Sequence, residues 1–126
     1  MAKILLIDDE EGMRRWTSHF LNTSGHDAFT AADGQPGIEL AREIKFDLVI
    51  TDIIMPDKEG LETIMELKKE YPDLPIVAMS GGGHMRSEDI LEMALSLGAV
   101  DTLQKPFTGD DLLEMIDRCL NPVSAL

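Results

Sequence analysis

The sequence predicts a single α/β domain in which a parallel β-sheet carries helices on both faces. The chain has 126 residues, which is an ordinary length for one domain. Short runs rich in apolar and β-branched residues alternate with longer segments whose apolar residues recur at helical spacing, and these patterns are typical of strands and amphipathic helices. Strands that alternate with helices form parallel sheets, because each helix returns the chain to the same end of the sheet.

The first strand is predicted at residues 3–7, where a continuous apolar run indicates a strand buried on both faces. Met13, Trp16 and Phe20 then recur at helical spacing, so we expect a helix whose buried face includes Trp16. Gly25 is expected to end this helix as a C-cap, because glycine adopts the left-handed conformation without strain.

The second strand is predicted at residues 26–31, and a helix is expected to begin after it, near Asp33 or Gly34. Pro36 falls in the first turn of this helix, where a missing N–H costs little. The apolar positions of the helix are Ile38, Leu40, Ala41 and Ile44.

The third and fourth strands are predicted at residues 46–51 and 75–79, and the helix between them is expected to close before Tyr71. A fourth helix is expected to stop at Gly98, and the fifth strand is predicted at residues 99–103. The apolar positions are Leu61, Ile64, Met65 and Leu67 in the third helix and Ile90, Leu91, Ala94 and Leu95 in the fourth.

The last helix has a start signal at Thr108, which can cap it together with Asp111, three residues further on. Phe107 and Leu112 are placed for a hydrophobic staple across this start. The apolar face of the helix is predicted to consist of Leu112, Leu113, Ile116 and Leu120.

The chain is predicted to be one domain over residues 1–121 with a loose tail at residues 122–126, and its composition excludes several classes of protein. With 24 acidic and 11 basic side chains it has a formal charge of −13, which argues against direct binding to nucleic acid. The charge fits solubility, a divalent cation or a basic partner. No apolar run approaches the roughly 20 residues that cross a bilayer and the start lacks a signal peptide, so we expect a cytoplasmic protein that binds no membrane. Cys119 is the only cysteine, which excludes an internal disulfide, and we expect it to be a small buried residue.

Polar side chains fall at the predicted carboxyl ends of the strands. Asp8 and Asp9 follow the first strand, Asp52 follows the third, Ser80 follows the fourth and Lys105 follows the fifth. Ligand sites in such sheets lie beyond the carboxyl ends of the strands. We therefore expect these side chains to gather at one edge of the sheet.

This group has the chemistry of a phosphoryl-transfer site. Two carboxylates 4 Å apart repel by about 4 kcal/mol at an effective dielectric near 20, so a proton or a cation must compensate. Oxygen ligands in a partly open site suit Mg²⁺, Lys105 adds a positive charge, and the Ser80 hydroxyl can bond a phosphoryl oxygen. We predict that Asp52 is the nucleophile that attacks phosphorus, because it lies centrally in the group.

These residues, with Asp52-Ile53-Ile54-Met55-Pro56 and Lys105-Pro106-Phe107, resemble the receiver domain of bacterial two-component response regulators, of the chemotaxis-regulator type. The resemblance covers residues 3 to about 120. It implies a flavodoxin-like fold whose five-stranded parallel sheet has the order 2-1-3-4-5, with five helices. It also implies that Asp52 accepts a phosphoryl group from the phosphohistidine of a sensor histidine kinase or a histidine phosphotransfer protein. Such a domain catalyses its own phosphorylation and dephosphorylation and is not a turnover enzyme.

The resemblance further implies a role for each site residue. The ligands of Mg²⁺ are expected to be Asp8, mainly through water, Asp9, Asp52 and the backbone carbonyl of Ile54. Ser80 is expected to swing toward the phosphoryl group, and Lys105 is expected to pair with it. The family's output surface, which binds a downstream effector, is commonly formed by the fourth helix, the fifth strand and the fifth helix.

Two features depart from the family pattern. The family usually has Tyr or Phe three residues before the lysine, where this chain has Thr102 as its candidate switch residue. The segment from Ser80 to Lys105 is about three residues longer than usual, with the surplus in a run of glycines of high backbone entropy. We therefore hypothesise that ordering of residues 81–87 and of the start of the fourth helix carries the signal, in place of an aromatic rotamer.

Three alternatives remain open from the sequence. A haloacid-dehalogenase-type phosphatase shares an aspartyl nucleophile, Mg²⁺ and a lysine, but it has a second Asp two residues after the first strand's nucleophile, where this chain has Asp8 and Glu10. A flavin-binding electron carrier has a similar topology, but the acidic loop after the first strand would repel a flavin phosphate. An interaction module that is never phosphorylated would explain the missing aromatic residue. The sequence fits both a stand-alone regulator and the receiver of a longer protein.

Overall fold

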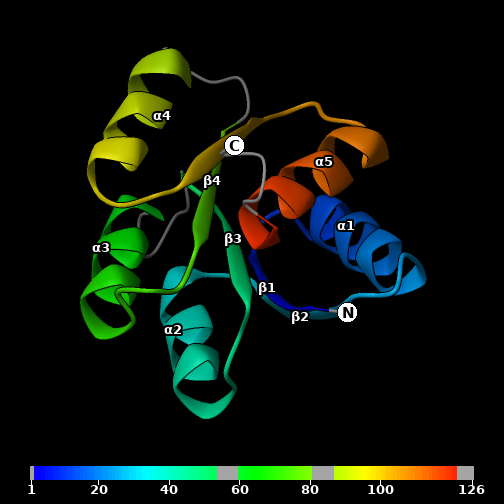
Figure 1. The fold of residues 1–126 in the computed structure, drawn as a ribbon, viewed down its shortest axis with the longest axis horizontal. Helices are drawn as coiled ribbons and strands as arrows, with labels where there is room; N and C mark the ends of the chain where they lie inside the picture. The colour runs from blue at the N-terminus through cyan, green and yellow to red at the C-terminus, as the bar shows by residue number, and fades with distance from the viewer. Residues whose placement is uncertain (1, 54–59, 81–86, 122–126) are drawn as a thin grey trace.

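The structure, a computed structural model, describes residues 2–53, 60–80 and 87–121. Strands and helices alternate along these residues in the order β1 Lys3–Ile7, α1 Glu11–Thr23, β2 Asp27–Ala31, α2 Gly34–Glu43, β3 Leu48–Asp52, α3 Gly60–Glu70, β4 Ile76–Ser80, α4 Ser87–Ser96, β5 Asp101–Gln104 and α5 Gly109–Leu120. The strands form one parallel five-stranded sheet in the order β2-β1-β3-β4-β5 (Figure 1). The predicted fold class and strand order are therefore confirmed.

The helices form two layers, one on each face of the sheet (Figure 1). Alternate residues of each strand point to opposite faces, so Leu5 and Ile7 of β1 pack with residues of α2, α3 and α4. Ile4 and Leu6 of the same strand pack with residues of α1 and α5 instead. Because both faces are covered, the inner strands read as continuous apolar runs, and this is the pattern that the sequence analysis recognised.

The strands β3, β4 and β5 lie one or two residues later than the sequence analysis predicted. Asp52 and Ser80 are the last residues of β3 and β4 and do not follow them. The reason is that both still belong to the parallel ladders, where Asp52 is paired with Met79 and Ser80 with Gln104. The backbone of both residues is thus fixed by the sheet itself.

The predicted signals at the helix ends are confirmed. Gly25 and Gly98 have φ angles of +93° and +122°, in the left-handed region that glycine adopts without strain. The Thr108 side chain accepts a hydrogen bond from the backbone N–H of Asp111, and the Asp111 side chain accepts one from the backbone N–H of Thr108. These reciprocal bonds form a capping box at the start of α5.

The prediction for Trp16 is wrong. Its side chain is 45% exposed, because the buried face of α1 is centred on Thr17 and Leu21. Trp16 lies at the edge of that face, where its ring stacks on Phe20 at a centroid distance of 5.5 Å.

Cys119 is half-buried, and burial raises the pKa of its thiol.

The apolar face of α5 is predicted only in part. Leu112 and Ile116 are buried, but Met115 is also fully buried and was not assigned to this face.

Among the described residues, no helix has both the length and the apolar composition that a membrane crossing requires. Residues 122–126 lie outside the described residues, so the loose tail stays a prediction.

Candidate functional site

The predicted polar side chains meet at the carboxyl edge of the sheet. β1, β3 and β4 are neighbours in the sheet and run parallel, so Asp8, Asp52 and Ser80 leave the same edge. Lys105 follows β5 and is joined to β4 by a hydrogen bond from its backbone N–H to the Ser80 carbonyl at 2.7 Å. The peptide bond between Lys105 and Pro106 is cis.

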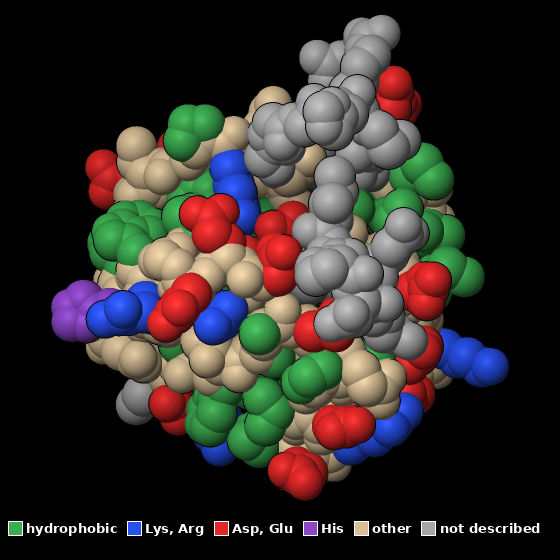
Figure 2. Space-filling view, turned by 180° about the vertical axis from the view of Figure 1, so that it is seen from behind, with side chains coloured by type: hydrophobic (Ala, Val, Ile, Leu, Met, Phe, Trp, Pro, Cys, Tyr) green, Lys and Arg blue, Asp and Glu red, His purple; other side chains and the backbone are tan. Residues whose placement is uncertain are grey.

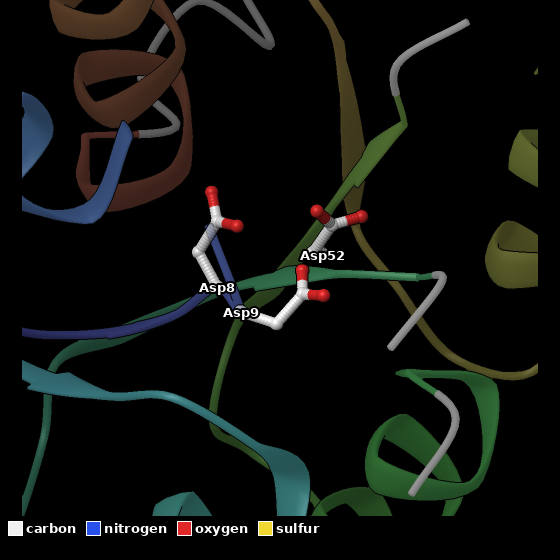
Figure 3. A group of neighbouring side chains, drawn as sticks. All are labelled: Asp8, Asp9 and Asp52. Carbon is white, nitrogen blue, oxygen red and sulfur yellow. The ribbon is translucent and has the colours of Figure 1, made fainter. Parts of the chain in front are cut away.

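Asp8, Asp9 and Asp52 form an acidic cluster. One carboxylate oxygen from each residue lies within 4.8 Å of the others, and Figure 3 shows the three side chains at the ends of neighbouring strands. Asp8 and Asp52 are only 1% and 8% exposed, whereas Asp9 is exposed. Burial strengthens the repulsion between these carboxylates, because the local dielectric is low.

Lys105 partly neutralises the cluster. Its Nζ lies 3.0 Å from Oδ2 of Asp8 and 3.0 Å from Oδ2 of Asp52. Burial of the ammonium lowers its pKa, but the Asp52 and Asp8 carboxylates outweigh burial and raise the pKa of Lys105 above its ordinary value. The lysine is therefore charged. One ammonium among three carboxylates still leaves the cluster negative.

The β1–α1 turn holds Asp8 through several bonds. The Asp8 N–H donates to the Ala31 carbonyl at 3.1 Å, and Asp8 Oδ1 accepts a bond from the Glu10 N–H at 3.0 Å. The Arg14 guanidinium donates to the Asp8 carbonyl at 2.7 Å. The position of Asp8 is consequently fixed at its backbone and at both carboxylate oxygens.

Asp52 is held against the start of α3. The Gly60 N–H donates to the Ile53 carbonyl at 2.7 Å, and the Ile53 N–H donates to the Met79 carbonyl at 3.1 Å. A Cβ atom at Gly60 would collide with the Asp52 carbonyl oxygen, so only glycine permits this approach. Neither Gly60 nor Arg14 is predicted from the sequence as a site residue. The only signal was a glycine opening a helix eight residues after Asp52.

Ser80 contributes a buried hydroxyl to the site. The residue is 1% exposed, and its Oγ has no hydrogen-bond partner among the described residues. A buried hydroxyl without a partner destabilises a fold by roughly 1–3 kcal/mol. It is also a donor for any ligand oxygen that reaches it.

Two predicted features lie partly or wholly outside this description. Ile54 and residues 81–86 are outside the described residues, so the carbonyl ligand and the ordering hypothesis stay predictions.

Thr102 is half-buried in β5, where it is paired with Ala78. Its backbone N–H donates to the Asp101 carboxylate at 2.8 Å.

The residues present fit a hard divalent cation. The cluster offers carboxylate oxygens alone, and one of its carboxylates is exposed, so a bound ion would keep several waters. Those are the preferences of Mg²⁺. Soft metals prefer thiolate or imidazole ligands, and the cluster has neither.

Comparison with known proteins identifies the family. The sequence pattern of the response regulator receiver domain matches residues 4–117. The chain belongs to this family. It is a receiver domain of the kind found in two-component response regulators, which interact with kinases and effectors, and no comparison favours a phosphatase of the haloacid-dehalogenase type.

Several known proteins resemble most of this chain. The DNA-binding transcriptional regulator NtrC of Azospirillum brasilense is 33% identical over 95% of this chain, and the chain spans 24% of its length. The transcriptional regulatory protein FixJ of Bradyrhizobium diazoefficiens is 32% identical over 93% of this chain, which spans 56% of its length. The chemotaxis protein CheY4 of Vibrio cholerae is 31% identical, with a TM-score of 0.86 over 95% of this chain and 99% of that one. A receiver domain protein from Clostridium thermocellum is 32% identical, with a TM-score of 0.89 over 98% of both chains.

Proposed function

We propose that this receiver accepts a phosphoryl group on Asp52 from a phosphohistidine of a sensor histidine kinase or a histidine phosphotransfer protein, in a reaction that requires Mg²⁺. One observation carries the proposal. The Lys105 ammonium bridges Asp8 and Asp52 inside an acidic cluster that it cannot neutralise. A protein gains no stability from such an arrangement, whereas phosphoryl transfer needs a carboxylate nucleophile, a cation and a metal at one point.

Asp52 is the nucleophile in this proposal. A carboxylate oxygen of Asp52 forms a bond to phosphorus while the bond between phosphorus and the donor imidazole nitrogen breaks, and the imidazole keeps the electron pair. Lys105 is within hydrogen-bond distance of Asp52 Oδ2 and stays close enough to pair with a phosphoryl oxygen after transfer. Burial of Asp52 lowers the local dielectric, which strengthens its interaction with Lys105.

The ion would be held by Asp9 and Asp52, with Asp8 acting mainly through water and the Ile54 carbonyl completing the set. When bound, Mg²⁺ supplies positive charge to the oxygens of the phosphoryl group. Asp8 meanwhile orients Lys105 through a hydrogen bond of 3.0 Å. The chain's own contribution is thus a preorganised set of oxygens and one ammonium.

Ser80 is the proposed sensor of the phosphoryl group. Its hydroxyl lacks a partner among the described residues, so a phosphoryl oxygen would supply the missing hydrogen bond. Because Ser80 is bonded through its carbonyl to the Lys105 N–H, movement at β4 is transmitted to β5 and to Thr102. Thr102 has no ring to move inward, which favours a different carrier of the signal.

The domain acts in this proposal as a phosphoprotein switch in the cytoplasm and not as a turnover enzyme. It catalyses its own phosphorylation and dephosphorylation, and phosphorylation changes a surface that binds an effector. The relatives NtrC and FixJ are named as transcriptional regulators, and this chain spans only part of each, so the effector is left as a partner of unspecified kind. No contact with nucleic acid or membrane is proposed for this domain.

Incubation with acetyl phosphate and Mg²⁺, followed by intact mass measurement, tests the proposal. The wild type should gain the mass of one phosphoryl group, and removal of Mg²⁺ with a chelator should prevent the gain. Asp52→Asn should gain nothing while keeping its fold. An equal gain in mass in Asp52→Asn would show that another residue is the acceptor.

A further inference from the structure

Arg14 reaches from the first turns of α1 to the end of β1. Its guanidinium donates to the Asp8 carbonyl oxygen at 2.7 Å, and its backbone N–H donates to the Glu10 carbonyl at 2.9 Å. The register between β1 and β3 ends at Ile7 and Thr51, so the Asp8 carbonyl lies beyond this ladder. Arg14 supplies the hydrogen bond that the sheet no longer provides.

Of the two neighbouring residues Asp8 and Asp9, Asp9 depends more on the bond from Arg14 to the Asp8 carbonyl. Its carboxylate is exposed, and it makes no hydrogen bond or ion pair with another side chain of the described part of the chain. Asp8, in contrast, is fixed at both oxygens by Glu10 and Lys105. The direction of the Asp9 side chain is therefore set by its backbone. That backbone follows Asp8, whose carbonyl accepts the bond from the Arg14 guanidinium. Figure 3 shows the Asp9 carboxylate directed toward Asp52.

We infer that Arg14 is a positioning residue of the acidic cluster, which keeps Asp9 directed toward Asp52 and so sets the affinity of the site for Mg²⁺. The inference rests on the proposed function, because it concerns the same metal site. Arg14 itself touches neither the acceptor nor the ion. It acts through the Asp8 carbonyl and the turn that carries Asp9.

A positioning role and a charge role predict opposite results. The guanidinium is bonded to the backbone of Asp8, a member of the acidic cluster, and its charge repels a cation held there. Loss of the charge alone would therefore strengthen the binding of Mg²⁺. Loss of the bond to Asp8 would loosen Asp9 and weaken the binding. Removal of a residue that orients metal ligands typically lowers metal affinity by about 10- to 100-fold.

The deciding experiment is a calorimetric titration of the metal-free full chain with Mg²⁺ alone. Arg14→Met should weaken the affinity about tenfold, and Arg14→Lys, which keeps a donor and the charge, should lie between Arg14→Met and the wild type. Arg15→Met is the matched control, because it removes the same charge from an exposed neighbour, and it should match the wild type. Amide NMR signals of residues 8–10 in the metal-free protein should shift in Arg14→Met and not in Arg15→Met.

Arg14→Ala, which keeps a strong helix former at this position, is measured alongside so that either folded variant decides the question. Mg²⁺ affinity in Arg14→Met or Arg14→Ala equal to or above that of the wild type would overturn the inference. Equal weakening in Arg15→Met would overturn it as well. Those outcomes leave the proposed function intact, whereas a wild type that binds no Mg²⁺ would overturn both.

Discussion

Ion pairs at opposite edges of the sheet differ in burial and in charge balance. At the carboxyl edge, Lys105 is bonded to Asp8 and Asp52, and the three side chains are 14%, 1% and 12% exposed. At the amino edge, Arg42 of α2 and Glu70 of α3 are joined by two hydrogen bonds of 3.0 Å, and their side chains are 48% and 33% exposed. The exposed pair has one charge of each sign, whereas the buried group adds a third carboxylate from Asp9.

The difference in burial and charge balance supports placing the proposed phosphoryl-transfer site at the carboxyl edge. Exposed pairs contribute little to stability, because water and salt screen them. A buried group with excess negative charge destabilises the fold unless a ligand compensates, and such groups mark functional sites. Surface shape alone would favour the amino edge as the site, because a cleft of about 740 Å³ lies there beside Arg42 and Tyr71. Figure 2 shows acidic side chains gathered around a basic one on the face opposite to that of Figure 1.

The largest expected difference between the two edges is in the rate of phosphorylation after the cation of each ion pair is replaced. Lys105→Met is expected to slow phosphorylation by acetyl phosphate about 100-fold, the usual effect of removing one preorganised donor from developing charge. Arg42→Met removes the cation of the exposed pair and should leave the rate unchanged. Intact mass followed over time measures both. A wild-type rate in Lys105→Met would contradict the proposed role of Lys105 in phosphoryl transfer.

Addition of Mg²⁺ should stabilise the whole domain, through ligands at the carboxyl edge alone. A ligand that binds the folded state raises the free energy of unfolding by about 2.7 kcal/mol at 100 times its dissociation constant. Asp9→Asn should lose most of this gain, and without Mg²⁺ it should be more stable than the wild type, because one repelling charge is gone. Glu70→Gln should keep the gain. Urea unfolding with and without a chelator gives these values, and an equal gain in Asp9→Asn would contradict the assignment of the metal site.

Gly60→Ala tests the packing under Asp52. The added Cβ would meet the Asp52 carbonyl oxygen, and overpacking of this kind lowers the free energy of unfolding by about 1–3 kcal/mol. Gly12→Ala is the matched control, because nothing lies within 4 Å of its added Cβ and alanine favours a helix by up to about 1 kcal/mol. Equal stability of the two variants in urea would show that α3 can move away from β3 freely.

His26 at the amino edge gives the smallest expected effect. Burial lowers the pKa of His26 below its ordinary value of 6.5, and its Nδ1 accepts a bond from the Ala2 N–H. The unfolded chain therefore takes up a proton first as the pH falls, so the stability is fully present above the unfolded pKa and declines below it. The advantage of the wild type over His26→Gln in urea should shrink between about pH 8 and about pH 5. A constant advantage would mean that His26 does not titrate differently in the two states.

The fold could be predicted well from the sequence because its signals are local. The continuous run at residues 3–7 and the caps at Gly25 and Thr108 each report on their own neighbourhood. The positions of the site residues followed from topology alone, since parallel strands bring their carboxyl ends together. The ends of β3 and β4 were predicted a residue early, because nothing in the local pattern says how far the ladder to the next strand extends.

Contacts that depend on three dimensions could not be predicted. The bond from Arg14 to the Asp8 carbonyl and the approach of Gly60 to Asp52 join groups whose distance only the folded backbone defines. Trp16 was placed in the core because it falls near the apolar stripe of its helix. The stripe is centred one position further on, and a shift of one residue turns a helical side chain by about 100°.

The central claim is that Asp52 is the phosphoacceptor of this cluster, and mapping the phosphoryl group tests it most directly. The wild type is treated with acetyl phosphate and Mg²⁺, digested, and examined by tandem mass spectrometry. The account predicts one modified peptide, with the phosphoryl group on Asp52, and its disappearance when Mg²⁺ is chelated. A phosphoryl group on Asp8, Asp9 or Ser80, or none on any residue while the protein binds Mg²⁺, would contradict it.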